Sequence, residues 1–249
     1  MTTYQADDVK EAVKERYAAV AQQGTSCCAP AVEAEDACCA PTEVRFTTKA
    51  DADSIIAEAD LGLSCGTPTV FGDINPGDTV LDLGSGAGVD AFRAAAVVGS
   101  DGHVIGVDFT PDMVDLAAAN AAKAGLETVE FRLGEIEDLP VVEGTVDVVL
   151  SNCVINLVPD KEKAFAEIHR VLAPGGRFII SDIVTTGELS DEVRSDLEQW
   201  AGCVSGAIGQ DAYLGIIRAA GFADIEIVTS HAYGDGVPTE SITVRGFKR

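Results

Sequence analysis

The amino-acid sequence predicts an α/β fold in which helices cover both faces of a doubly wound sheet. Three observations support this prediction. From residue 78 onward, short apolar runs alternate with longer amphipathic stretches; a glycine-rich turn, Gly84 to Gly88, follows the first run; and an acidic residue, Asp108, ends the second. Strands that alternate with helices are joined by crossovers and therefore lie parallel to one another.

Each expected strand is a short run of β-branched and other apolar residues bounded by turn residues. We expect strands at residues 79–83, 103–108, 129–132, 146–151, 177–181, 224–229 and 241–246. The triplet Pro174-Gly175-Gly176 precedes the fifth run and is expected to form a loop. Asp182 follows that run, where it would serve either as a group near the active edge or as a cap of the strand end.

An N-terminal helix is expected over residues 5–22, because apolar residues such as Val9 and Val13 recur there at helical spacing. Pro111 opens a second predicted helix, as proline commonly does at the first helical position. The remaining helices are expected from residue 89 and at 161–172, 190–200 and 210–220. Trp200, near the end of the 190–200 helix, is expected to pack close to Cys203.

The chain divides into three predicted regions. Residues 1–60 hold the first helix and a cysteine-rich flexible segment with two vicinal pairs, Cys27-Cys28 and Cys38-Cys39. Residues 61–185 form the cofactor-binding core, and residues 186–249 supply the last helices and strands. Small residues and prolines around the cysteine pairs indicate a loop that could fold over a ligand.

The charge balance restricts the function classes. The formal net charge is −24, with 41 acidic residues against 17 basic ones, of which only seven are lysine. Binding to nucleic acid or to an anionic membrane requires basic contacts and is therefore not expected. Acidity spread along the chain favours a salt-adapted origin, because concentrated salt screens self-repulsion; an ordinary acidic enzyme is the alternative.

Compartment and assembly follow from composition. No apolar run reaches the length of a membrane span, and the first ten residues are polar, so we expect a soluble, cytoplasmic protein without a signal peptide, favoured as a monomer. Seven cysteines in such a protein indicate thiols that are kept reduced for reactivity or ligation.

The glycine-rich turn indicates a cofactor site. Gly84, Ser85, Gly86 and Gly88 follow the first strand and open the first core helix, and Val89 stands where a dinucleotide fingerprint requires its last glycine. Asp82 precedes the turn, where its carboxylate would accept an ammonium group. Asp108 ends the second strand, where it would accept both hydroxyls of a ribose. S-adenosylmethionine offers both groups and no pyrophosphate, which separates it from a nicotinamide cofactor.

This ensemble resembles the class I S-adenosylmethionine-dependent methyltransferases, with a Rossmann-like, seven-stranded sheet. The resemblance implies that Asp108 holds the ribose and that Met113 packs near the adenine. It further implies that Ile136 and Glu137 contact the adenine and that Asn152 lines the methionine end of the cofactor.

Three cysteines stand in loop-like settings around this core. Cys153 directly follows the fourth strand, so topology places it at the same sheet edge as the glycine turn. Cys65 lies in Leu63-Ser64-Cys65-Gly66 and Cys203 in Trp200-Ala201-Gly202-Cys203. A single cysteine at such a position is equally consistent with a small core residue. A trio of them favours chemistry on a soft, thiophilic atom.

These segments, together with Ser151-Asn152-Cys153-Val154-Ile155-Asn156-Leu157, resemble the arsenite S-adenosylmethionine methyltransferases over about residues 13–224. The vicinal pairs at 27–28 and 38–39 also occur in microbial members. Ser64 and Thr67 depart from the family pattern around the first cysteine, which affects the detail of that loop. Longer members carry an additional C-terminal domain that this chain largely lacks.

The resemblance implies that Cys65, Cys153 and Cys203 bind trivalent arsenic, delivered as a thiol conjugate of arsenite. The arsenic lone pair would then attack the sulfonium methyl group, giving methylarsenicals for detoxification. A cysteine pair becomes a disulfide when arsenic returns to the trivalent state, and thioredoxin or a small thiol reduces it. Cys27, Cys28, Cys38 and Cys39 would capture arsenic; a zinc site and a mobile loop are their alternatives.

Two other functions stay open. A methyltransferase of a small organic acceptor would share the cofactor core but would not need three thiols. A non-catalytic, thiol-rich metalloid-binding protein would keep the fold without turning over the cofactor.

Overall fold

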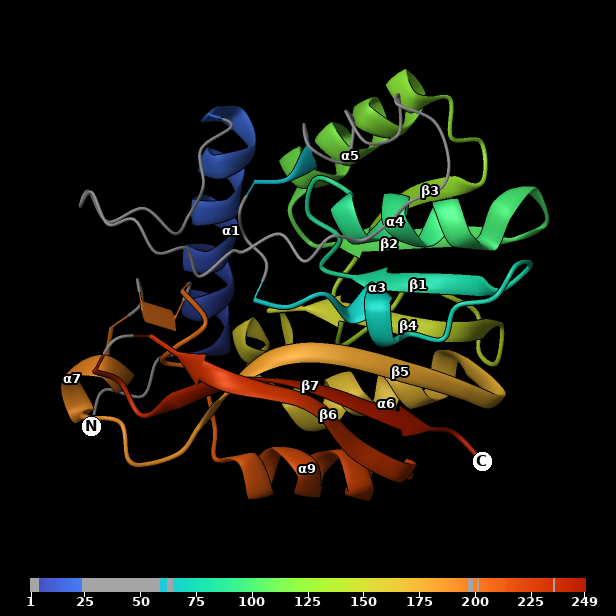
Figure 1. The fold of residues 1–249 in the computed structure, drawn as a ribbon. Helices are drawn as coiled ribbons and strands as arrows, with labels where there is room; N and C mark the ends of the chain where they lie inside the picture. The colour runs from blue at the N-terminus through green and yellow to red at the C-terminus, as the bar shows by residue number, and fades with distance from the viewer. Residues whose placement is uncertain (1–4, 24–58, 62–64, 197–198, 201, 235) are drawn as a thin grey trace.

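The structure is a computed structural model, and it describes residues 5–23, 59–61, 65–196, 199–200, 202–234 and 236–249. Its centre is a seven-stranded sheet in the order β3-β2-β1-β4-β5-β7-β6 (Figure 1). The strands are β1 (Thr79–Leu83), β2 (His103–Asp108), β3 (Val129–Leu133), β4 (Val146–Asn152), β5 (Leu172–Thr185), β6 (Ala223–Tyr233) and β7 (Thr239–Phe247). All seven predicted strands are present, and the predicted α/β fold class is confirmed.

The first five strands are parallel, as predicted from their alternation with helices. The chain order reverses at β1, which pairs with β2 on one side and with β4 on the other. Clefts that hold ligands form at such a reversal, beyond the carboxyl ends of the strands. At the other end of the sheet, β7 lies antiparallel between β5 and β6.

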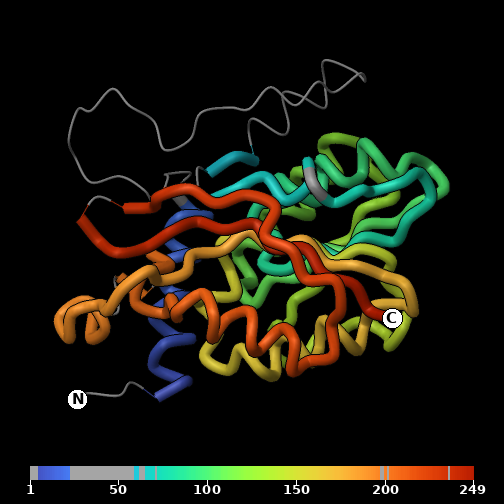
Figure 2. Tube along the Cα trace, turned by 60° about the horizontal axis from the view of Figure 1, so that its bottom comes forward, coloured from blue at the N-terminus to red at the C-terminus, as the bar shows by residue number. Residues whose placement is uncertain are grey.

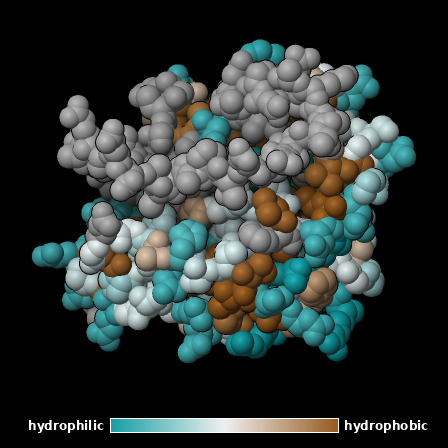
Figure 3. Space-filling model, in the orientation of Figure 1, coloured by the Kyte–Doolittle hydropathy of each residue, from teal (hydrophilic) through white to brown (hydrophobic). Residues whose placement is uncertain are grey.

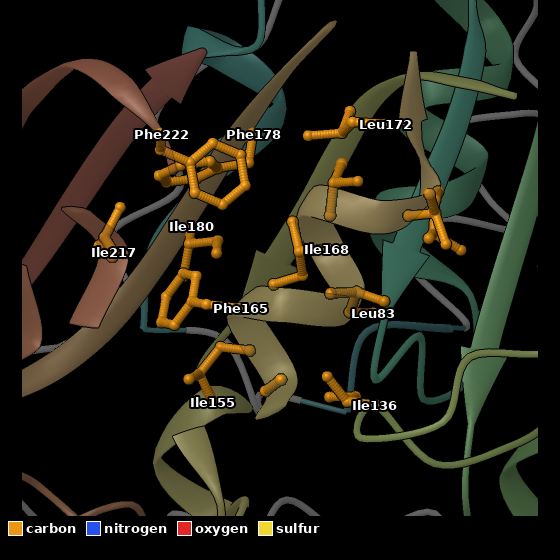
Figure 4. Close-up of a cluster of buried hydrophobic side chains, with 14 of the residues drawn as sticks. Leu83, Ile136, Ile155, Phe165, Ile168, Leu172, Phe178, Ile180, Ile217 and Phe222 are labelled. Atoms are coloured by element: carbon orange, nitrogen blue, oxygen red, sulfur yellow. The ribbon is translucent and has the colours of Figure 1, made fainter. Parts of the chain in front are cut away.

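Helices cover both faces of the sheet. Successive residues of β1, such as Val80 and Leu81, belong to different hydrophobic clusters because their side chains point to opposite faces of the sheet. On one face α4 (Val89–Val98) packs with α3 (Pro68–Phe71) and lies beside α5 (Pro111–Ala124). On the other face lie α6 (Lys161–Val171) and α9 (Gln210–Ala219), over the larger cluster shown in Figure 4.

Local sequence explains how these helices begin and end. Pro111 occupies the first turn of α5, and Gly125 ends that helix with φ 64°, a left-handed conformation that favours glycine. The carboxylate of Asp160 accepts a hydrogen bond from the backbone N–H of Lys163 at 2.9 Å and so caps α6. These three helix boundaries therefore follow from residues that suit them.

The N-terminal helix α1 (Ala6–Gln23) stands beside the sheet, next to α5 and to the short helix η2 (Ile155–Leu157) that follows β4. Figures 1 and 2 both place it on the opposite side of the molecule from the C-terminus. Its apolar residues Val9, Val13 and Val20 are buried. The predicted helix at 5–22 is confirmed, and it closes one side of the region beyond the strand ends.

Three local expectations were wrong. Residues 173–176 lie inside β5, where the register with β4 shifts and Gly175 adopts φ 81°, so the expected loop is an irregular part of the strand. The expected helix at 190–200 is not continuous: α7 (Asp191–Arg194) ends at a turn at Ser195, and residues 199–200 are helical again. Asp182 lies within β5 and pairs with Ile242, so it does not follow the strand end.

Figure 3 shows a face on which hydrophilic residues predominate and apolar residues form separate groups. The exposed large hydrophobic residues of the described part lie apart in the sequence, in α3, α4, β3 and the loop before β4; they are Val70, Val97, Leu133 and Val142. Among the described residues, no helix is both long and apolar enough to cross a bilayer.

Candidate functional site

A cavity lies at the carboxyl ends of β1, β2 and β4, with α1 as one of its walls. Its empty volume is about 1080 Å³ including its open mouth, a size that suits a cofactor. Most residues that the sequence predicts as cofactor ligands line it: Asp82, Gly84, Ser85, Gly86, Asp108, Ile136, Glu137 and Asn152. Of the predicted thiols, Cys153 lines it directly.

The glycine turn is held against β2 by its backbone. The N–H groups of Gly84 and Ser85 both donate to the carbonyl oxygen of Val107, at 2.8 and 3.1 Å. Gly84 and Gly86 adopt φ 63° and 50°, which side chains other than hydrogen rarely allow. Gly84 and Gly86 therefore present backbone without a side chain at the cavity that they line.

Asp82 supplies a buried carboxylate at the cavity wall. Its side chain is almost completely buried, and its Oδ2 has no hydrogen-bond partner among the described residues. Burial, and next the neighbouring carboxylate of Asp90, raise the pKa of Asp82 well above its usual range. Ser85 Oγ is likewise buried without a described partner. A cationic group in the cavity would stabilise the charged form of Asp82.

Asp108 is fixed by backbone donors at the end of β2. Its Oδ2 accepts from Gly86 N at 3.0 Å and its Oδ1 accepts from Thr110 N at 2.9 Å. Burial raises the pKa of Asp108, whereas these backbone N–H groups lower it. The carboxylate thus connects the glycine turn to the start of α5 and has a fixed orientation toward the cavity that it lines.

Sequence reasoning missed Lys10, which comes from α1. Its Nζ lies 2.7 Å from carboxylate oxygens of both Glu135 and Glu137, in the loop after β3. Lys10 lines the cavity with those two residues. No local pattern distinguishes it from the other lysine of the same helix, because the pairing depends on how α1 docks.

Two predicted cofactor residues lie away from the cavity. Met113 is fully buried on α5 and is absent from the cavity wall. Gly88 adopts φ 100° and caps α4, and a β-carbon there would lie 2.6 Å from the ring of Phe92. Gly88 therefore shapes the turn through helix packing, while Met113 contributes to the core.

The three cysteines predicted as ligands come together, but two of them are bonded to each other and are not reduced thiols as expected. Cys65 and Cys153 form a disulfide with a Cα–Cα distance of 5.7 Å. The Sγ of Cys203 donates to the carbonyl oxygen of Cys153 at 3.0 Å. All three pack in one hydrophobic cluster with residues of α1, and Trp200 packs against the same cluster, as predicted. Cys65 and Cys153, which are 88 residues apart in the sequence, are thus neighbours in space.

Cys153 and Cys203 also share an unusual backbone conformation. Their φ angles are 60° and 65°, in the left-handed region that residues with a β-carbon seldom adopt. Such backbone strain is maintained only where surrounding contacts hold it, and it concentrates at functional sites. Glycine or asparagine at these positions would have indicated a left-handed backbone, but cysteine gives no such signal, so the sequence did not predict this conformation.

The vicinal pairs Cys27-Cys28 and Cys38-Cys39 lie outside the described residues. Within the described part of the chain, no group of three or more His, Cys, Asp or Glu side chains is arranged to hold a metal ion. Because Cys65 and Cys153 are bonded to each other, their sulfurs become ligands only after that disulfide is reduced.

Comparison with known proteins gives consistent results. The sequence model of the methyltransferase domain family matches residues 74–221. An arsenite methyltransferase of Halobacterium salinarum is 48% identical over 230 residues, which are 89% of this chain and 59% of that protein. The human arsenite methyltransferase is 37% identical over 161 residues, 61% of this chain and 43% of that protein.

Among solved structures, the chain is similar to the arsenic(III) S-adenosylmethionine methyltransferase of Chlamydomonas reinhardtii. The TM-score is 0.65 with 34% identity, and the match covers 80% of this chain and 73% of that one. The chain spans about three-fifths of the Halobacterium protein and less than half of the human one.

Proposed function

Because this chain belongs to the methyltransferase domain family, and within it to the arsenic(III) S-adenosylmethionine methyltransferases, we propose that it transfers methyl groups from S-adenosylmethionine to arsenite held by cysteine thiolates. The observation that carries this proposal is the gathering of Cys65, Cys153 and Cys203 in one cluster, with Cys153 on the wall of the cofactor cavity. Thiolates select a soft ion such as trivalent arsenic over hard cations.

The residues around the cavity fit the cofactor. When bound, S-adenosylmethionine supplies an electrophilic methyl group on a positively charged sulfur. Asp82 and Ser85 each present a buried oxygen without a described partner, which suits the ammonium and carboxylate end of such a molecule. Asp108, oriented by Gly86 and Thr110, suits the ribose hydroxyls. Ile136 and Glu137 line the remaining side and would hold the adenine, with Gly84 and Gly86 allowing close approach.

The thiols would hold the substrate. Reduction of the Cys65–Cys153 disulfide by two electrons frees two sulfurs, and Cys203 adds a third. Three sulfurs around trivalent arsenic leave its lone pair for the attack on the methyl carbon, and no general base is needed. Positioning of this kind contributes about 7–11 kcal/mol in well-aligned reactions. After transfer, re-formation of the disulfide supplies the two electrons that return arsenic to the trivalent state.

The partners follow from this chemistry. The substrate would be arsenite as a thiol conjugate, and thioredoxin or a small cytoplasmic thiol would reopen the disulfide by exchange. Cys27, Cys28, Cys38 and Cys39 would capture arsenic and pass it to the central trio. We expect no nucleic-acid partner, because a protein with a net charge of −24 lacks the basic contacts that bind the phosphate backbone.

The test is direct. Reduced protein is incubated with arsenite, S-adenosylmethionine and glutathione in concentrated potassium chloride, and arsenic species are separated and measured by elemental detection. Methylated arsenic that is lost in Cys153→Ser and in Cys203→Ser supports the proposal. The matched control is Asp115→Asn, an exposed position outside the cavity and the cysteine cluster. Bound cofactor without methylated arsenic would overturn it and favour an organic acceptor.

A further inference from the structure

Two asparagines flank Cys153 within five residues of sequence, and their side chains reach different parts of the molecule. Asn152 ends β4, and Asn156 lies in the short helix η2. Asn152 contacts the segment that carries Cys65, whereas Asn156 contacts the turn that carries Cys203. The segment that holds Cys153 therefore touches the backbone of both other cysteines.

The amide of Asn152 is fully used by protein groups. Its Oδ1 accepts from the backbone N–H groups of Cys65 and Gly66, at 3.1 and 3.2 Å. Its Nδ2 donates to the carbonyl oxygen of Gly66 at 2.8 Å and to Asp90 Oδ2 at 3.0 Å. An asparagine side chain offers two donors and two acceptor positions, so these four bonds saturate it.

The Cys65–Gly66 backbone is held from a second side as well. Ser241 Oγ donates to the carbonyl oxygen of Cys65 at 2.9 Å. A β-carbon on Gly66 would lie 2.5 Å from Ser181 Oγ, so glycine permits the segment to approach β5 this closely. Ser241 and Ser181 thus contact this backbone from one side, and the Asn152 amide hydrogen-bonds to it from the side of Cys153.

Asn156 contacts the Cys203 turn from a fully buried position, with its amide acting as a donor only. Its Nδ2 donates to the carbonyl oxygens of Ile183, at 2.7 Å, and of Cys203, at 3.3 Å. The turn packs tightly on it, because a β-carbon on Gly206 would lie 2.1 Å from the carbonyl oxygen of Asn156. The Nζ of Lys161 donates to that same oxygen at 3.2 Å.

We propose that Asn152 and Asn156 are positioning residues, each holding one partner cysteine beside Cys153: Asn152 the Cys65 segment, and Asn156 the Cys203 turn. Asparagine suits position 152 because one amide both donates to and accepts from backbone groups, which a carboxylate of the same shape does not. At position 156 the amide acts as a donor only, and its Oδ1 has no hydrogen-bond partner among the described residues. That this placement of the cysteines serves arsenic binding rests on the proposed function, but the placement itself is tested without arsenic. Asn152 also lines the cavity, so the expectation that it lies at the methionine end of the cofactor stays a prediction.

The first arm measures the Cys65–Cys153 disulfide. In the balanced exchange, two protein thiols and one oxidised glutathione give the protein disulfide and two reduced glutathiones. After equilibration and alkylation, each cysteine of the trio is followed in its own tryptic peptide, between Lys49 and Arg93, Arg132 and Lys161, and Arg194 and Arg218. Asn152→Ala lowers the equilibrium constant roughly tenfold, about 30 mV, because the Cys65 segment loses its hydrogen bonds. Asn156→Ala changes it less than about threefold.

The second arm measures Cys203 with the disulfide intact. Asn156→Ala raises the alkylation rate of buried Cys203 roughly tenfold, since the turn opens more often, whereas Asn152→Ala changes it less than about threefold. Each variant is thus the control for the other. If an alanine variant does not fold, Asn152→Ser or Asn156→Ser provides the same comparison, with unfolding midpoints measured throughout.

Three results would overturn the proposal. The first is an unchanged glutathione equilibrium in Asn152→Ala or an unchanged Cys203 alkylation rate in Asn156→Ala. The second is that both quantities shift in both variants in proportion to the lost stability of the whole protein. The third is Asn152→Ala with an unchanged glutathione equilibrium and weakened binding of S-adenosylhomocysteine, which would make Asn152 a cofactor contact. A wild-type protein that fails to methylate arsenite would contradict the proposed function and leave these measurements intact.

Discussion

The backbone of Gly84 lies directly against the side chain of Val154: a β-carbon on Gly84 would lie 2.5 Å from a methyl carbon of Val154. Gly84 belongs to the turn that lines the cofactor cavity, and Val154 follows Cys153. The cofactor turn and the thiol segment are therefore in van der Waals contact, and a change in one displaces the other.

Gly84→Ala is accordingly expected to affect both sites. The φ of 63° and the clash with Val154 together destabilise the protein by about 1–3 kcal/mol. Binding of S-adenosylhomocysteine, measured by calorimetry, should weaken at least about tenfold. The control is Gly144→Ala, which also has positive φ but open space around its β-carbon. Equal binding losses in the two variants would contradict the explanation.

Asp82→Asn should separate binding from stability. Removing a buried carboxylate without a full set of partners raises the free energy of unfolding by about 1 kcal/mol or more at neutral pH. Binding of S-adenosylhomocysteine should fall at least about tenfold, because the ammonium group loses its carboxylate. Urea unfolding and calorimetry measure the two effects. Unchanged affinity would show that Asp82 has no contact with the cofactor.

Asp182 is expected to make stability depend on pH. Burial raises its pKa to about 7 from 3.8, although Lys161 and the hydroxyl of Tyr213 favour the carboxylate. The folded state thus binds the proton more tightly than the unfolded state, so this group's stabilisation is complete below about pH 4 and is lost as the pH rises toward 7.

The loss amounts to roughly 4 kcal/mol over that interval. When urea unfolding is measured between about pH 4 and 7, the free energy of unfolding should therefore fall less with rising pH in Asp182→Asn than in the wild type. The exposed Asp115, replaced by Asn, is the matched control. Parallel curves for wild type and Asp182→Asn would contradict the assignment.

Lys10→Met should loosen the wall that α1 adds to the cavity. Its partners Glu135 and Glu137 lie on the loop after β3, and Glu135 is half exposed, so the unfolding free energy should change by less than about 1 kcal/mol. Affinity for S-adenosylhomocysteine should fall by roughly threefold to tenfold, with the larger effect in dilute salt. Lys14→Met on the same helix should leave it unchanged.

Stability should also rise with salt, because a net charge of −24 repels itself. The Debye length falls from about 10 to 3 Å between 0.1 and 1 M potassium chloride, which screens this repulsion. The urea midpoint is expected to increase over that range and to stay lower in glycerol of matched osmolality. A protein equally stable at both salt concentrations would contradict a salt-adapted surface.

Local pattern was sufficient to predict the strands, most of the helices and the cofactor turn. Apolar periodicity distinguishes strands from helices, and crossovers bring the carboxyl ends of parallel strands to one edge. Asp82 and Asp108 could therefore be assigned to one site from sequence alone. The 190–200 helix was predicted as continuous, whereas α7 ends at a turn at Ser195, whose hydroxyl donates to the carbonyl oxygens of Asp191 and Glu192.

The sequence by itself determined the order of elements, the glycine turn and the presence of three cysteines in loop settings. Only the tertiary structure decided that Cys65 bonds to Cys153, that Lys10 meets Glu135 across 125 residues, and that Asp182 is buried. The physical reason is range: periodicity and turn chemistry act over a few residues, whereas these contacts depend on how α1 and the last strands dock on the finished sheet.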